Sequence, residues 1–333
     1  MDTARYSIRS FEAADFTRDN PLTAEAWREI FEGYREQLGG EFYEAFYPNW
    51  RDRKYNEFCA SMNRNAEAGR AVTVADRDGL IAAMGSYTVR GSVGVICSNA
   101  VRRELRGQGI GHAMYDELIR RMRAEGLRFA EVTTGGDDAH AGARRAYQAA
   151  GFGHPVPHVL YFRDNDKAVC GLPLPENAAI RPPREEEYAA VASIAVEAWA
   201  PIWRESEKML GELFAPMRGD VRRAKYDSTM DALRNEQTRC FVLTENGKIA
   251  GFCSWRQEGA NAQVGLNGVA DAFRGHGYGF LMQQYITADM RARSIRYARV
   301  LTGGDPGHAP ARHTYEKSGF SAFLPSVTYS MAL

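Results

Sequence analysis

The chain has 333 residues, a length that suits two domains of ordinary size, each able to bury its own core. Its 42 basic and 42 acidic residues give a formal net charge of zero, so the charge favours neither a nucleic acid nor a membrane as a partner. No apolar run approaches the roughly 20 residues that span a bilayer, and residues 1–20 lack the apolar core of a signal peptide. The five cysteines are scattered, without a Cys-x-x-Cys pair, so we expect a cytoplasmic protein with no disulfide framework and no metal.

The first half of the chain alternates between patterns typical of strands and of helices. Apolar residues in alternation predict strands, and apolar residues three and four apart predict helices. The predicted strands are 6–11, 72–75, 81–89, 93–101, 129–133 and 152–162, with a hairpin turn at 76–79; the predicted helices are about 21–38, 51–68, 110–123 and one that carries Arg144 and Tyr147.

Acidic and aromatic residues gather around the end of the first predicted helix. They are Glu41, Tyr43, Glu44, Tyr47 and Trp50. This group could line a pocket for a cationic substrate. The simpler alternative is a helix face that packs on the sheet with its glutamates in solvent.

A polar stretch with Gly171, Pro173 and Pro175 is the best linker candidate, and the order of elements then repeats. Domain boundaries follow as 1–165, a linker at 166–177, and 178–333. The second half is predicted to form helices at about 185–199, 218–235, 278–293 and 308–317 and strands at 240–244, 249–255, 263–269 and 297–301.

A glycine-rich turn stands between a strand and a helix in each half, at 106–111 and 274–279. Such a turn leaves several backbone N–H groups unpaired at the positive end of a helix, and glycine lets a ligand approach the backbone closely. The turn is therefore expected to bind an anion, with Arg106 or Arg274 adding a charge.

The surroundings of the two turns also repeat. An offset of 168 holds without a gap from Asn99/Asn267 to Tyr161/Tyr329, and 27 of those 63 positions are identical. A repeat of this length indicates a duplicated domain, because solenoid units run to only about 20–50 residues.

Two motifs in each half carry a family resemblance. Arg-x-x-Gly-x-Gly opens a helix, and Ala-Arg-x-x-Tyr-x-x-x-Gly-Phe follows after the next strand. The chain resembles the GCN5-related N-acetyltransferase (GNAT) superfamily as two tandem domains. The resemblance implies an α+β (three-layer) fold in each half, with a mixed, mostly antiparallel sheet flanked by helices.

The resemblance also implies a cofactor site for acetyl-CoA in each half, and hence two bound cofactors. Its residues would be Val101, Arg106, Gly107, Gln108, Gly109, Ile110, Gly111, His140 and Arg144 in the first copy and Val269, Arg274, Gly275, His276, Gly277, Tyr278, Gly279, His308 and Arg312 in the second. A backbone N–H at Val101 or Val269 would polarise the thioester carbonyl.

Tyr147 and Tyr315 are the candidate catalytic residues, because a phenol can protonate a departing thiolate. Their alternative is an aromatic side chain that packs on the sheet. His140 and His308 stand where the family usually has asparagine; each could contact the cofactor, relay a proton or have no role. Asn99/Asn267, Asp137/Asp305 and Glu131 do not single out a base.

The predicted function is transfer of an acetyl group from acetyl-CoA to a primary amine of a small molecule, by a monomer or homodimer. The alternatives are a protein or peptide N-acetyltransferase, and a CoA-binding sensor or scaffold with one or both sites inactive. A mycothiol synthase is a further enzyme alternative without a motif of its own here. We expect unequal acceptor pockets, and the aromatic Trp199, Trp203 and Trp255 favour the C-terminal half as the dominant one.

Overall fold

The computed structural model describes residues 5–16, 22–76 and 78–333, and at Thr23 and Ala24 the backbone alone. Arg77 of the predicted hairpin turn therefore lies outside the described residues. The chain forms two compact units. Unit 1 comprises residues 1–39, 47–156 and 326–333, and unit 2 comprises 40–46 and 157–325.

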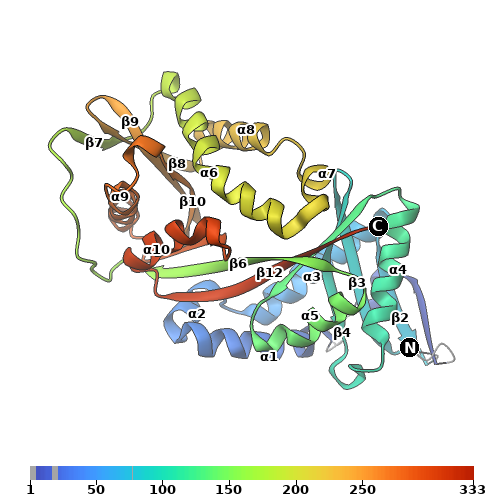
Figure 1. Cartoon of the computed structure of the whole chain (residues 1–333). Coiled ribbons are helices and arrows are strands. Elements are labelled where there is room, and N and C mark those ends of the chain that lie inside the picture. Colours follow the sequence, from blue (N-terminus) through green and yellow to red (C-terminus); the bar gives the residue numbers. More distant parts are fainter. Residues whose placement is uncertain (1–4, 17–21, 77) are drawn as a thin grey trace. The chain divides into compact units, whose positions relative to one another are not determined.

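Unit 1 is a mixed sheet with helices on both faces (Figure 1). Its strand order is β1-β2-β3-β4-β5-β12, antiparallel except where β4 runs parallel to β5. The strands are β1 (Tyr6–Ser10), β2 (Ala71–Asp76), β3 (Ile81–Arg90), β4 (Val93–Val101), β5 (Phe129–Gly135) and the end of β12 (Ala322–Ala332); the helices are α1 (Leu22–Leu38), α3 (Trp50–Glu67), α4 (Ile110–Ala124) and α5 (Ala141–Ala149).

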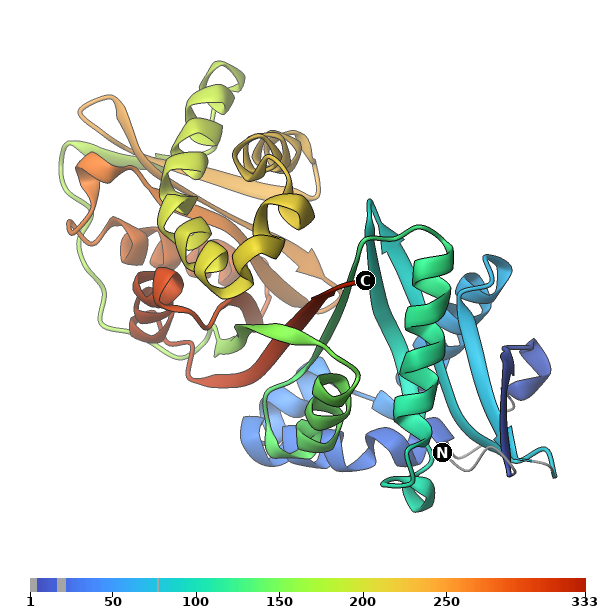
Figure 2. The ribbon, with the colours of Figure 1, turned by 45° about the vertical axis from the view of Figure 1, so that its right-hand side comes forward.

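Alternating side chains of β3 attach the helices of unit 1 to opposite faces of its sheet. Met84 is buried with Phe58 and Met62 of α3, whereas a side chain at the next residue, Gly85, would meet Met114 of α4. Successive residues of a strand point to opposite faces, so α3 and α4 cover different faces. Figure 2 shows α4 lying lengthwise along the strands. The glycine gives α4 a close approach to the sheet.

Unit 2 repeats this plan. Its strand order is β6-β11-β10-β9-β8-β7, and β10 runs parallel to β11. Helices α6 and α8 lie together on one face, where Phe252 packs with Val191 and Ala195, and α9 packs on the other face (Figure 1). The elements are β6 (Gly153–Asp164), β7 (Ala178–Arg181), α6 (Tyr188–Leu210), α7 (Phe214–Arg218), α8 (Val221–Arg234), β8 (Thr238–Glu245), β9 (Lys248–Glu258), β10 (Asn261–Val269), α9 (Tyr278–Ala292), β11 (Tyr297–Gly303), α10 (Ala309–Lys317) and the short α2 (Gly40–Phe46).

The last strand of each sequence repeat completes the unit built by the other repeat. Residues 326–332 of β12 pair with β5, and residues 158–164 of β6 pair with β11. The two pairings are equivalent under the repeat offset, because Tyr329 faces Val132 and Tyr161 faces Val300. The compact units are therefore not continuous in sequence, whereas the boundaries 1–165 and 178–333 stay a prediction about the repeat.

The predicted fold class and nearly all the predicted elements are confirmed. One helix is longer than expected: α6 continues through Pro201 to Leu210, although a proline inside a helix removes one hydrogen bond. Strand β7 was not among the predicted elements. Within the described part of the chain, no helix is long and apolar enough to cross a bilayer.

The acidic and aromatic group after α1 does not form a substrate pocket. Helix α2 belongs to unit 2, where Phe42 packs against Phe162 and Tyr297 and Glu41 lies 3.5 Å from Arg296. Tyr47 and Trp50 instead pack against Phe31 of α1. The alternative interpretation, in which these residues pack against neighbouring elements, is therefore the correct one.

Candidate active site

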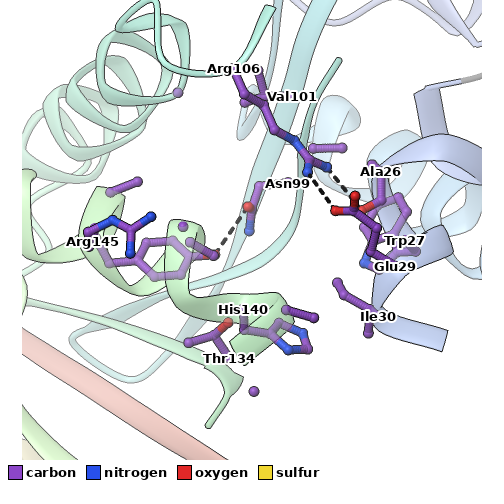
Figure 3. Close-up of a pocket in the computed structure, with 18 of the residues that line it drawn as sticks. Ala26, Trp27, Glu29, Ile30, Asn99, Val101, Arg106, Thr134, His140 and Arg145 are labelled. Carbon is purple, nitrogen blue, oxygen red and sulfur yellow. Dashed lines mark hydrogen bonds and ion pairs between the residues drawn. The ribbon is translucent and has the colours of Figure 1, made fainter. Parts of the chain in front are cut away.

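A cavity of about 820 Å³ lies in unit 1, where the glycine turn, β4, β5, α1 and α5 meet (Figure 3). It is large enough for a drug-sized ligand. Its lining includes Trp27, Glu29, Ile30, Phe31, Tyr34, Lys54, Cys97, Asn99, Val101, Arg106, Gly107, Gly109, Ile110, Gly111, His112, Tyr115, Thr134, His140, Arg145, Tyr147 and Ser326.

The glycine turn forms one end of the cavity. Gly107 and Gly109 have φ angles of +80° and +77°, values that side chains rarely adopt, and Gly109 is the N-cap of the 15-residue α4. The first N–H groups of α4 have no partner within the helix, so this end of the cavity offers backbone donors and positive dipole. Arg106 donates to the carbonyl of Ala26 at 3.1 Å and lies 3.6 Å from the Glu29 carboxylate (Figure 3).

The centre of the cavity lies where β4 and β5 separate. Among the described residues the two strands are paired only from Val93 to Ile96 on β4. A register shift in the pairing with β3 leaves Cys97 as an extra residue, which is a β-bulge. Between the described residues Cys97 and Val101, the edge of β4 on the side of β5 borders the cavity and is not paired with β5. A backbone N–H near Val101 can therefore donate to a carbonyl oxygen in the cavity.

Tyr147 closes the cavity from α5. Its hydroxyl donates to Asn99 Oδ1 at 3.1 Å, and Tyr115 of α4 donates to the same oxygen at 2.9 Å. Both phenols are buried. Burial raises the pKa of Tyr147 and that of Tyr115, so both remain protonated at neutral pH.

His140 and Asp137 form a pair after β5. His140 Nδ1 lies 2.8 Å from Asp137 Oδ2, and the Asp137 side chain also accepts from the His140 backbone N–H. Burial alone would raise the pKa of Asp137, but the hydrogen bond from His140 lowers it overall. An Nδ1–H donated to the carboxylate leaves Nε2 of the imidazole as an acceptor.

Arg144 supports this loop rather than the cavity. Its Nη1 donates to the carbonyls of Gly135 and Asp137 at 2.7 and 2.6 Å. Gln108 likewise points back along the chain, since its amide donates to the Glu104 carbonyl at 3.5 Å. Neither side chain lines the cavity, so their predicted contact with a cofactor remains untested.

Unit 2 reproduces much of this geometry. Gly275 and Gly277 have φ angles of +85° and +79°. Asn267 Nδ2 donates to the Tyr315 hydroxyl at 2.6 Å, and burial raises the pKa of Tyr315 to about 12. Beyond Val264 the pairing of β10 with β11 also stops among the described residues. His308 lies 2.6 Å from Asp305, and Arg312 donates to the carbonyls of Gly303 and Asp305 at 2.6 and 2.7 Å.

One linker residue lies against the second glycine turn, whereas Gly275 and His276 of the turn are exposed. Leu172 of the linker lies against Gly277, where its Cδ1 would be 3.1 Å from an added Cβ, and its backbone N–H donates to Gln284 of α9 at 3.1 Å. Elsewhere in unit 2, in the loop after β11, a Cβ added to Gly307 would lie 3.0 Å from Ile202 Cα and 3.1 Å from the Pro201 carbonyl oxygen, so α6 packs closely on this loop. The hydroxyl of Tyr278 donates to Glu245 at 2.6 Å, and Arg274 pairs with Asp271 at 2.8 Å.

Several cavity residues were not predicted from the sequence. Arg145 and His112 stand beside predicted residues and could have been found as polar side chains next to the motifs. Trp27 and Lys54 come from helices that lack a motif. Ser326 comes from β12, which enters this unit from the far end of the chain. No local signal indicates such a residue.

Comparison with known proteins places the chain in a family. The family model "Acetyltransferase (GNAT) family" matches residues 27–152 and 201–320, which together make up most of the chain. The chain therefore belongs to the GNAT family, as a tandem member with two GNAT domains. No curated protein sequence matches the chain significantly.

Two solved structures are similar to the chain in fold at low sequence identity. A GCN5-related N-acetyltransferase from Sphaerobacter thermophilus is 16% identical with a TM-score of 0.59, covering 98% of this chain and 95% of its own. A tandem GNAT protein from the clavulanic acid biosynthesis pathway is 15% identical with a TM-score of 0.53, and 98% of each chain is covered. At this identity the likeness supports the fold and leaves the substrate to be argued from the site.

Proposed function

We propose that this protein is an acetyl-CoA-dependent N-acetyltransferase of a small-molecule primary amine, and that unit 1 is its catalytic half. One observation supports this most: a single cavity joins the glycine turn, the separated edge of β4 and the buried phenol of Tyr147. These are the groups that an acetyl transfer from a thioester needs.

The residues of unit 1 fit acetyl-CoA as a cosubstrate. The N–H groups at the start of α4, helped by Arg106, would hold the pyrophosphate, and Arg145 also lines this cavity and could add charge. The edge of β4 near Val101 would hold the pantetheine arm and donate to the thioester oxygen.

In the transfer, an N–C bond forms to the acetyl carbon and the C–S bond breaks. Tyr147 gives its proton to the sulfur as general acid, and its raised pKa keeps that proton available at neutral pH. The amine loses a proton, which His140 Nε2 accepts directly or through a water, while Asp137 holds the imidazole in place. After the products leave, Tyr147 regains a proton from solvent and His140 returns its proton to solvent.

The shape of the cavity favours a small acceptor over a peptide. Trp27, Phe31 and Tyr34 of α1 form an aromatic wall, and the one carboxylate among its described lining residues, Glu29, is occupied by Arg103 and Arg106. A peptide or lysine substrate would favour an exposed acidic groove.

The contact of Leu172 with the glycine turn of unit 2 supports a second, narrower proposal. We propose that unit 2 does not catalyse, because Leu172 occupies the approach to Gly277. This differs from the preference for the C-terminal half that its tryptophans suggested. The second sequence repeat would instead support the fold and supply residues 326–332 of β12, with Ser326, to unit 1.

Thiol release from acetyl-CoA, measured with a panel of amines, tests the proposed function. Acetylation of at least one small amine is expected, with the rate abolished by Gly109→Asp, which places a carboxylate where the pyrophosphate would lie. Thiol release that no amine stimulates, together with CoA binding, would support the sensor alternative.

A further inference from the structure

The two faces of the sheet give the cavity of unit 1 a cofactor side and an acceptor side. Asn99 points to the face of α4 and α5, where it binds Tyr115 and Tyr147. The bulge turns Cys97 to the opposite face, where its sulfur lies 3.5 Å from Ser61 and 3.3 Å from Asn65 of α3. Groups from α1 and α3 therefore reach the cavity across the sheet from Tyr147.

Lys54 of α3 is the cation of this acceptor side. It lines the cavity together with Trp27, and its Nζ lies 4.7 Å from the centre of the Trp27 ring. Among the described residues, no carboxylate lies within ion-pair distance of it. Glu57, on the next turn of α3, is exposed and pairs with Arg53 at 3.8 Å.

Burial of an ammonium without a counter-ion is unfavourable. Desolvation lowers the pKa of Lys54 overall; Arg53 acts in the same direction, and the charges of Glu57 and Cys97 act against it. A cation–π contact with a tryptophan recovers only part of the lost hydration. An anionic group in the adjoining cavity would compensate for the remaining loss of hydration of the Lys54 ammonium. An acceptor whose only charge is its ammonium would instead be repelled by Lys54.

We propose that the acceptor is an amine that also carries a carboxylate, and that Lys54 binds this carboxylate from the side of the cavity opposite Tyr147. The inference depends on the proposed function, because it names the acceptor class of the same site. Trp27 flanks the ammonium and makes the site suited to an amino acid with an apolar or aromatic body.

Matched acceptors that differ only in the carboxylate test the inference. Phenylalanine is compared with 2-phenylethylamine, and ω-amino acids of two to six carbons are compared with the corresponding alkylamines, by thiol release from acetyl-CoA. For at least one pair, kcat/KM of the carboxylated member should be higher by about 10–100-fold. This is the effect expected when a substrate gains one charge-assisted hydrogen bond in a partly buried site.

Lys54→Met should remove this preference by raising KM for the carboxylated acceptors, with little change for the plain amines or for acetyl-CoA. Lys54→Arg should retain part of it. Lys225→Met is a matched control, since the Lys225 ammonium in unit 2 also lies over a tryptophan, 3.1 Å from the ring centre of Trp199. The control should leave both acceptor classes unchanged.

Three results would overturn the inference while the proposed function stands. The wild type could acetylate both members of every pair equally or prefer the plain amines. Lys54→Met could lower kcat for all amines alike, which would make Lys54 a base. It could instead raise KM for acetyl-CoA, which would place Lys54 at the cofactor. If no amine of either class were acetylated, the proposed function itself would fail, and the inference with it.

Discussion

Removal of the tyrosine hydroxyl in each unit, at Tyr147 or at Tyr315, distinguishes an effect on kcat from an effect on the free energy of unfolding. Tyr147→Phe keeps the buried ring but deletes the proton that this phenol would give to the sulfur. Loss of a general acid should lower kcat by about 10²–10⁴-fold, which corresponds to about 3–5 kcal/mol of barrier. The variant should remain folded, because Asn99 Oδ1 still accepts from Tyr115 at 2.9 Å. The cost in unfolding free energy should be about 1 kcal/mol.

Tyr315→Phe is the matched control in unit 2, and its effects should be the reverse. It removes the hydroxyl that accepts from Asn267 Nδ2 at 2.6 Å and leaves that amide without this partner. The expected loss of stability is therefore larger, about 1–3 kcal/mol, while kcat should hardly change.

The assay combines initial rates of thiol release at saturating acetyl-CoA with thermal melts of both variants. Equal losses of kcat would indicate two working or coupled sites. A greater loss in Tyr315→Phe would move the chemistry to unit 2. An unchanged kcat in Tyr147→Phe would remove this tyrosine from the mechanism.

Three further predictions concern binding, assembly and pH. Calorimetry should give one CoA per chain, with binding abolished by Gly109→Asp and retained in Gly277→Asp; two per chain would show that Leu172 leaves the second turn accessible. Cleavage near Gly171 should give two fragments that stay associated, because each contributes a strand to both units; two independently folded monomers would contradict the exchange. Arg120 and then Arg121 lower the pKa of Glu117 to about 2, so its contribution to stability is present above its ordinary pKa of 4.5 and lost as the pH falls toward 2. The difference in melting temperature between wild type and Glu117→Gln should accordingly shrink below pH 4.5, and a difference that stays constant with pH would refute this ion pair.

The parts of the fold that were predictable are those with a local cause. Glycine at positive φ, alternating apolar strands and the repeat offset can all be recognised from neighbouring residues. The structure confirms strand 93–101 and helix α4 closely. Helix α6 was underestimated because Pro201 is a local signal to stop. Packing of α6 on Phe252 and on the loop at Gly307 outweighs the lost hydrogen bond.

The sequence did not indicate that β6 and β12 each pair with the sheet built by the other repeat. β6 and β12 occupy the same place in the repeat, so either one satisfies the pattern of either sheet, and Tyr161 and Tyr329 are even identical. For the same reason Ser326 could not be assigned to the cavity of unit 1. Trp27 and Lys54 were missed because their helices belong to the part of the chain without a motif, and only the tertiary packing brings them together.

The most direct test of the central claim is the electron density of crystals soaked with acetyl-CoA. One cofactor is expected per chain, with its pyrophosphate at residues 107–111 and its sulfur within hydrogen-bond distance of the Tyr147 hydroxyl. The open end of the thioester channel should then face Lys54. A cofactor seated at residues 275–279 alone, or a sulfur remote from Tyr147, would contradict the assignment of catalysis to unit 1.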